Sequence, residues 1–391
     1  MYIHVIKSLI RLCFQIYNSE NVGFGGFAME TPENCDARQD TQKIGRADGA
    51  QHYIHYLSVL KCAGMLAVIG IHVFCTPVTY WHEAFSPAEL FIAFFVTNIL
   101  RCWAVPVFVM ASGALFLGRQ TDVRRMWGKY ILRLALVLLT FGMMFALMEI
   151  MFDERAPRPA MILSALKRVY AGETWSHLWF VYMCMGLYIL TPPLQRMLRS
   201  LDSSALKYLL AVLFVFNCFV PFLNSITEVT FGVYIPIAGI WLFYYLLGYA
   251  LHNDVIKIDT RLSIIFILLG VLWCSLGQLV PNMRDFYSAR LRYADTADIV
   301  GVLVSFGIFS LAKSKCSQRM DFLDTAVNPL TFGVYIIHAF FINLMLKALH
   351  FTPDRFSAPL MWAVVYAVTT VGSLFSVWLL RKISFVRKRI L

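Results

Sequence analysis

Long, almost unbroken runs of apolar residues dominate the chain from residue 56 onwards. Most are about 18 residues or longer, which is the length that an α-helix needs to cross the hydrocarbon core of a bilayer. They are too long and too uniformly apolar for barrel strands, in which apolar and polar positions alternate. The pattern predicts an all-α, polytopic membrane protein of about ten transmembrane helices, at 56–79, 88–117, 130–151, 177–197, 205–222, 232–251, 262–280, 296–312, 328–349 and 359–380.

The composition agrees with this prediction. Of the 391 residues, 59% are hydrophobic and 15% are charged, whereas charged residues make up about a quarter of a typical soluble protein. The nine cysteines lie mostly within the apolar runs and show no CxxC pair or other metal-ligand spacing. We therefore interpret them as small packing residues, and we expect neither a disulfide framework nor a bound metal.

Residues 1–52 differ in kind from the rest of the chain. After a short amphipathic start they are polar, glycine-rich and without periodicity, which is typical of a disordered segment. No small-residue cleavage site follows the start, so a signal peptide is not expected, and Met29 is an alternative first residue. The pattern predicts a disordered cytoplasmic segment at 1–52, a ten-helix membrane domain at 53–380 and a basic cytoplasmic tail at 381–391.

Positive charge is distributed unequally between the two sides of the predicted membrane domain. With the loops assigned alternately, 23 of the 34 Lys and Arg residues fall on the side of both termini and eight on the other, while Lys61, Arg101 and Lys347 lie inside spans. Cytoplasmic loops carry the excess of Lys and Arg in membrane proteins, so we expect both termini in the cytoplasm. This asymmetry accounts for the net charge of +11, and nucleic acid is not an expected partner.

Ionisable residues inside the spans need an explanation, because each costs about 2.5–3.5 kcal/mol or more at the membrane centre. Arg101 lies near the middle of its span, five residues before Pro106, which should kink the helix and free main-chain carbonyls. Arg101 either bonds to those carbonyls or binds an anion such as a phosphate, a carboxylate or a thioester oxygen. Lys61 and His72 are eleven residues apart and project from one face of the first span. Each can have a structural role alone, but both can also line one cavity.

Other polar candidates lie in or near the ends of later spans. His177 opens the fourth span at its non-cytoplasmic end. Tyr335 and His338 are three residues apart in the ninth span, so they share one helix face. Each of these side chains can simply be a structural hydrogen-bonding group. Glu149, near the outer end of the third span, can orient a histidine or lie among the headgroups.

Two segments combine these residues with a fixed spacing. KCAGMLAVIGIH runs from Lys61 through ten residues to His72, and RCWAVPVFVMASG runs from Arg101 to Gly113. Further along the chain are HLWF at 177–180 and VYIIH at 334–338. Gly113 is better suited to close helix packing than to chemistry.

Together these segments resemble the acyltransferase 3 family, whose members are integral membrane enzymes that acylate surface carbohydrates. The family has arginine at the position of Lys61, and lysine keeps the charge but loses the bidentate fork. A basic R-x-x-R motif of the family is only partial here, with Tyr130 before Arg133. The resemblance covers residues 53 to about 380 and is greatest to the enterobacterial common antigen O-acetyltransferase type.

The resemblance implies transfer of an acetyl group from cytoplasmic acetyl-CoA, as co-substrate, to a sugar hydroxyl of a surface polysaccharide or its lipid-linked precursor. It places the chain as a multi-pass protein of the bacterial cytoplasmic (inner) membrane, with the lipid bilayer, acetyl-CoA and a glycan acceptor as partners. The implied catalytic residues are His72, as general base or covalent acetyl carrier, and Arg101, as donor to an oxyanion or a CoA phosphate. The implied CoA-binding residues are Lys61, Arg124, Arg125 and Arg133, and the implied acceptor-binding residues are Trp175, His177, Trp179, Tyr335 and His338.

Two alternative functions remain open at this level. A polysaccharide or small-molecule exporter would also have about ten helices and charges inside the membrane, although discontinuous helices and repeated halves are not evident. A transferase for succinyl or another acyl group would share the same motifs.

Overall fold

A computed structural model describes residues 54–154, 160–227, 231–232, 239–279, 299–318 and 320–391. The predicted N-terminal segment at 1–52, with the alternative start at Met29, lies outside the described residues. Every regular element within the described ranges is helical, so the predicted all-α class is confirmed for this part of the chain.

The longer helices are α2 (His55–Tyr80), α3 (Pro87–Phe116), α6 (Met143–Glu154), α7 (Ala160–Ala171), α8 (Trp179–Ser200), α9 (Ser203–Phe214), α10 (Val220–Thr227), α11 (Ile240–His252), α12 (Thr260–Leu279), α14 (Ile299–Lys315), α15 (Thr331–Asn343) and α16 (Ala358–Leu380). The short elements are η1 (His82–Ala84), α4 (Val123–Arg125), η2 (Met126–Ile131), α5 (Leu132–Val137), η3 (Leu138–Gly142), η4 (Ser176–Leu178), η5 (Val215–Phe219), η6 (Phe322–Val327), η7 (Asn328–Leu330), η8 (Leu344–Ala348) and α17 (Ser384–Arg389). Several short elements are single π-helical turns that continue a neighbouring α-helix, as η2 and η3 do around α5.

Within the described residues, seven helical stretches are long and apolar enough to cross a membrane, at His55–Tyr80, Pro87–Phe116, Val123–Met151, Ser176–Ser200, Ser203–Asn224, Phe322–Ala348 and Ala358–Leu380. Each of them coincides with one of the predicted spans. The three remaining predicted spans fall on α11, α12 and α14, whose predicted ranges extend in part into residues that the structure does not describe. The structure therefore supports a multi-pass helical protein, with seven candidate spans in the part of the chain that it describes.

Local sequence signals define where several helices begin. Before α3, the Ser86 hydroxyl accepts from the Glu89 main-chain N–H, and the Glu89 carboxylate accepts from the Ser86 main-chain N–H, 2.8 Å away. Pro87 occupies the first helical position, where a missing N–H costs nothing. Asp202 caps α9 and Asp259 caps α12 by the same kind of acceptance from a main-chain N–H.

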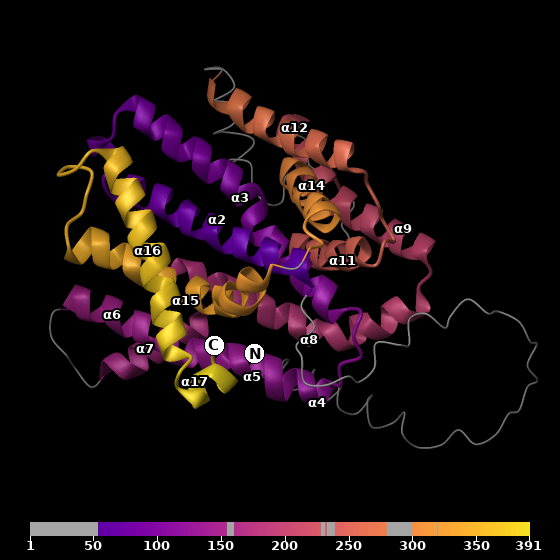
Figure 1. The fold of residues 1–391 in the computed structure, drawn as a ribbon, viewed down its shortest axis with the longest axis horizontal. Coiled ribbons are helices and arrows are strands. Elements are labelled where there is room, and N and C mark those ends of the chain that lie inside the picture. Colours follow the sequence, from indigo (N-terminus) through magenta and orange to yellow (C-terminus); the bar gives the residue numbers. More distant parts are fainter. Residues whose placement is uncertain (1–53, 155–159, 228–230, 233–238, 280–298, 319) are drawn as a thin grey trace, which may run out of the picture. The chain divides into compact units, whose positions relative to one another are not determined.

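Helix α2 lies within the bundle and packs against α3, α14, α15 and α16 (Figure 1). Helix α3 also packs closely on α11, because two glycines let the backbones approach. A Cβ at Gly113 would lie 1.9 Å from the main-chain oxygen of Tyr245, and a Cβ at Gly248 would lie 2.0 Å from that of Met110. The predicted packing role of Gly113 is thus confirmed.

Pro106 lies within α3, which continues as one helix from Pro87 to Phe116. Proline has no N–H, so it leaves the carbonyl four residues earlier, that of Cys102, without its helical donor. The Ser305 hydroxyl on α14 donates to this carbonyl, with an O···O distance of 3.0 Å. A neighbouring helix therefore satisfies the carbonyl that Pro106 leaves, and the guanidinium of Arg101 is not required for it.

Candidate active site

Three histidines that are far apart in the sequence meet inside the bundle. His72 comes from α2, His177 from η4 at the start of α8, and His338 from α15. The ring centroids of His72 and His177 lie 5.1 Å from that of His338 in each case, and 6.3 Å from each other. His177 is 3% exposed and His338 is 0% exposed, whereas His72 is half-buried. We call these three residues the histidine cluster.

Main-chain carbonyls fix the tautomers of two of the three rings. His177 Nε2 lies 3.0 Å from the Ile336 oxygen, and His338 Nδ1 lies 2.6 Å from the Tyr335 oxygen. A carbonyl only accepts, so each of these nitrogens donates and carries the proton. In the neutral rings, His177 Nδ1 and His338 Nε2 are therefore lone-pair acceptors. His338 Nε2 is buried and has no hydrogen-bond partner within the described part of the chain.

Tyr335 joins the histidine cluster to a neighbouring cavity. Its hydroxyl donates to the main-chain carbonyl of His177, and its ring centroid lies 6.0 Å from that of His177 and 5.8 Å from that of His338. The same side chain forms part of the wall of the cavity, next to Phe180, with 5.1 Å between the two ring centroids. The cavity and the cluster thus lie on two sides of one tyrosine.

The cavity has a volume of about 240 Å³ and lies between α2, α3, η2, α5, α8 and α15. Its described lining includes two cations, Lys61 and Arg133, and several hydroxyl groups, among them that of Ser112. Most of the remaining lining is aromatic or aliphatic, and it includes the thiol of Cys184. We call this space the cationic cavity after these two cations. Its mostly apolar wall strengthens the electric field of the two charges.

The two cations have different surroundings. Arg133 Nε donates to the main-chain oxygen of Ile390 over 3.1 Å, and its guanidinium lies 5.7 Å from the centroid of the Phe332 ring. Lys61 lies within electrostatic range of Asp324. Asp324 is 2% exposed and faces His55, with 2.5 Å between carboxylate oxygen and ring nitrogen.

Sequence reasoning missed the pair of His55 and Asp324. The available signal was an acidic residue just before the ninth predicted span, in a stretch assigned to a loop. It also missed Cys184 and Tyr188 in the wall of the cationic cavity. No sequence signal marked these two residues, because they lie within an apolar run without a motif of their own.

Arg101 is exposed on α3 and does not belong to the described lining of the cationic cavity. A Cβ at Gly70 would lie 2.8 Å from the Leu100 side chain, so this part of α3 lies beside the turn of α2 that carries His72. Arg101 is within electrostatic range of Cys75, which lies three residues after His72 on α2. Its role in catalysis stays a prediction.

The predicted acceptor-binding tryptophans separate in the structure. Trp175 stacks on Phe145 with 4.2 Å between ring centroids and lies 6.3 Å from His177. Trp179 is 43% exposed and packs on Trp241 instead, with ring centroids 5.2 Å apart. Only Trp175 therefore adjoins the histidine cluster through contacts of the described residues.

The other predicted charged residues lie apart from the cluster. Arg124 and Arg125 are exposed in α4 and are not in the described lining of the cationic cavity, whereas Arg133 is. Glu149 forms an ion pair with Arg168 of α7, with 3.4 Å between nitrogen and oxygen. From the sequence, Glu149 is expected either to orient a histidine or to lie among the headgroups. Its ion pair with Arg168 gives no support to the first of these roles.

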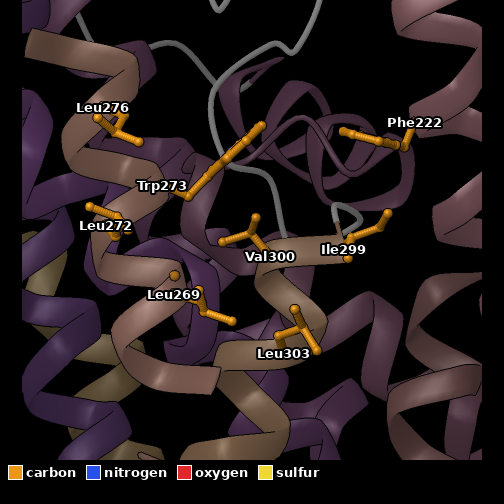
Figure 2. Close-up of a pocket in the computed structure, with 9 residues that line it drawn as sticks. Phe222, Leu269, Leu272, Trp273, Leu276, Ile299, Val300 and Leu303 are labelled. Carbon is orange, nitrogen blue, oxygen red and sulfur yellow. The ribbon is translucent and has the colours of Figure 1, made fainter. Parts of the chain in front are cut away.

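A second cavity, of about 270 Å³, lies between α10, α12 and α14 (Figure 2). The described residues that line it are apolar, and the indole of Trp273 carries the one polar side-chain group among them. Such a lining offers no charge for a phosphate and no base for proton transfer. The candidate chemistry therefore belongs to the cationic cavity and the histidine cluster.

The described residues thus form a multi-pass helical protein with a histidine cluster beside a cationic cavity. The family model described as Acyltransferase domain matches residues 54–381. This chain therefore belongs to the acyltransferase domain family and is a membrane acyltransferase in the broad sense. No curated protein and no solved structure matches the chain.

Proposed function

We propose that this acyltransferase moves an acetyl group from acetyl-CoA to a sugar hydroxyl of a surface polysaccharide or of its lipid-linked precursor, in the bacterial inner membrane. The observation that supports this proposal best is the position of Tyr335. It is at once a wall of the cationic cavity and the hydrogen-bonding partner of two histidines. In the proposed complex, an anionic donor in the cavity and a base in the histidine cluster both adjoin this tyrosine.

The proposal includes a ten-span topology with both termini in the cytoplasm. With the seven candidate spans, three further crossings at α11, α12 and α14 would make ten. The excess of Lys and Arg on the side of the termini supports the orientation. In this orientation Lys61 and Arg133 lie toward the cytoplasm, which is where acetyl-CoA is made.

The size of the cationic cavity limits which part of the donor it can hold. At about 240 Å³ it is smaller than the cavities of about 300–1,000 Å³ that enclose drug-sized ligands. We assign it to the narrow thioester arm, with the nucleotide outside. Lys61 and Arg133 then hold phosphate oxygens, and the arm extends toward Tyr335 and the histidine cluster.

In the proposed reaction the sugar oxygen forms a bond to the thioester carbonyl carbon and the carbon–sulfur bond breaks. His72 accepts the hydroxyl proton, which is returned to the thiolate sulfur so that free CoA leaves as a thiol. The His72 ring is half-buried, so one of its nitrogens can accept this proton. Arg101, beside this turn of α2, supplies positive charge for the oxyanion. Alternatively, His72 carries the acetyl group covalently between donor and acceptor.

The first test compares surface glycan from cells that carry the wild-type chain, His72→Ala or His82→Ala at matched membrane levels. Base-labile O-acetyl groups are scored by NMR. We expect the acetyl signal to be lost with His72→Ala and kept with His82→Ala, because His82 is exposed in η1 outside the cluster. Identical glycans from wild type, His72→Ala and a deletion strain would contradict the proposed acceptor.

Labelled donors separate the remaining alternatives. Purified protein in vesicles should transfer label from acetyl-CoA, and the glycan that receives it tests the resemblance to the enterobacterial common antigen type. Transfer from succinyl-CoA in its place would assign a different acyl group. Glycan movement across the membrane without any acyl donor would support an exporter.

A further inference from the structure

Resting on the proposed function, we propose that His338 is a positioning residue for His72. Its Nε2 accepts a hydrogen bond from the His72 ring and so fixes which nitrogen of His72 faces the substrate. Three features support this role: the tautomer of His338, the spacing of the rings and the burial of Nε2.

The tautomer of His338 is imposed by the backbone of its own helix. Nδ1 donates to the Tyr335 oxygen over 2.6 Å, so the proton of the neutral ring resides there. Nε2 then has a lone pair and no proton, and it can only accept. This end of the ring is 0% exposed along with the rest of the side chain.

The spacing of the rings selects His72 as the donor. Imidazole nitrogens lie about 1 Å from the ring centre, so two rings joined by an N–H···N bond of about 3 Å have centroids about 5 Å apart. His72 and His338 are 5.1 Å apart, which matches this value. His72 and His177 are 6.3 Å apart, which is too far for a direct bond.

His177 also cannot supply a proton to His338. Its Nε2 proton is directed at the Ile336 oxygen, which leaves Nδ1 as a second acceptor. Two acceptors facing each other form no bond, although the His177 and His338 rings are also 5.1 Å apart. His72 is thus the member of the cluster with an N–H to give.

The planes of the His72 and His338 rings meet at 45°, and an N–H···N bond tolerates such a rotation of one ring about the bond. Turning an imidazole ring over exchanges carbon and nitrogen positions with little change in shape. With such a turn, the proposed bond directs an N–H of His72 at the buried Nε2 of His338, which has no partner within the described residues. A buried acceptor without a donor is unfavourable, so the bond is favoured over the unbonded arrangement.

This bond assigns the steps of proton transfer. With one His72 nitrogen donating to His338, the other has a lone pair and accepts the proton of the sugar hydroxyl. The positive charge that forms on His72 is stabilised because His338 accepts its other proton more strongly. When the carbon–sulfur bond breaks, His72 returns the proton to the sulfur, and His338 stays neutral throughout.

The test uses two amide substitutions that imitate different nitrogens of the ring. In His338→Gln the side-chain amide reaches the position of Nε2 and its oxygen can accept from His72, whereas in His338→Asn it reaches only the position of Nδ1. We expect His338→Gln to keep kcat within about 10-fold of wild type and His338→Asn to lower it by about 100-fold or more. KM for acetyl-CoA should be unchanged in both, since the donor phosphates bind elsewhere.

Equal kcat values for the two variants, or a higher value for His338→Asn, would overturn the proposal. If His338 acts only structurally, through its bond to the Tyr335 carbonyl, His338→Asn is expected to keep the higher kcat. Membrane levels and thermal unfolding of both variants are measured beside wild type. If wild type itself transfers no acetyl group, the proposed function fails, and the inference is then decided by a measurement independent of activity.

That measurement is 15N NMR of the full chain in nanodiscs, labelled at the histidine rings. The His338 signals are assigned by elimination with variants of the other histidines. We expect a protonated Nδ1 and an unprotonated Nε2 at His338, and a shift of the His338 Nε2 signal on His72→Ala as its donor is removed. The opposite tautomer, or an unchanged Nε2 signal, would refute the proposed contact.

Discussion

Replacement of Lys61 by methionine should weaken acetyl-CoA binding about 30-fold. Lys61 is half-buried in the wall of the cationic cavity, where Arg133 is the other described cation. A hydrogen bond between charged groups contributes about 1.5–3 kcal/mol, and about 2 kcal/mol corresponds to a change of about 30-fold in Kd. Methionine has a similar length, so Lys61→Met removes the charge and keeps most of the packing.

The turnover number of Lys61→Met should stay close to that of wild type. Lys61 and His72 are eleven residues apart on α2, which is about 16 Å along the helix axis. A phosphate contact this far from the thioester stabilises the bound substrate and the transition state equally, so its loss raises KM and leaves kcat unchanged.

The assay is titration calorimetry of acetyl-CoA into the protein in nanodiscs, which needs no acceptor. Lys207→Met is the matched control, because Lys207 is exposed on α9 outside the described cavity lining and its loss removes the same charge. Dephospho-CoA, which lacks the 3′-phosphate, should show a smaller difference if Lys61 contacts that group. Equal Kd values for wild type and Lys61→Met would refute the assignment of this cavity to the donor.

Three further predictions concern the supporting structure. Tyr335→Phe removes the donor to the buried His177 carbonyl and should lower stability by about 1–3 kcal/mol, measured by thermal unfolding in detergent, with kcat reduced as well. Gly113→Leu should abolish folding, judged by size-exclusion chromatography, because its Cβ would meet a main-chain oxygen of α11 at 1.9 Å, whereas Gly128→Leu, with nothing within 4 Å, should fold. A lysine ammonium holds the pKa of Asp254 below its ordinary value, so this pair stabilises the fold above about pH 4 and the contribution disappears as pH falls through the lowered pKa. Asp254→Asn should therefore lower the free energy of unfolding by less than about 1 kcal/mol at pH 7, seen as a slightly lower Tm, and should leave it unchanged at pH 2. An equal loss of stability at both pH values would contradict this prediction.

Much of the fold follows from the sequence because a bilayer leaves few choices. A chain in hydrocarbon must satisfy its backbone internally, so long apolar runs without strand alternation can only be helices. The start of α3 also follows a local rule, since Ser86, Pro87 and Glu89 form its N-terminal cap. The spans predicted at α11, α12 and α14 extend into residues that the structure does not describe, so their full lengths stay a prediction.

The sequence also identified the residues of the histidine cluster, through short motifs on three separate spans. It did not show that His72, His177 and His338 meet, or that Tyr335 separates them from Lys61 and Arg133. A membrane helix is apolar on every side, so it lacks the amphipathic stripe that shows which face meets a neighbour.

Only the tertiary structure decided which polar groups pair. Glu149 pairs with Arg168 and Asp324 with His55, and both pairs join segments far apart in the chain or on different helices. The tautomer of His338 depends on a local main-chain carbonyl, but the meaning of its free Nε2 depends on α2 lying alongside. Sequence determined which side chains enter the membrane, and helix packing decided which of them touch, because contact between spans depends on the rotation and crossing of whole helices rather than on any local pattern.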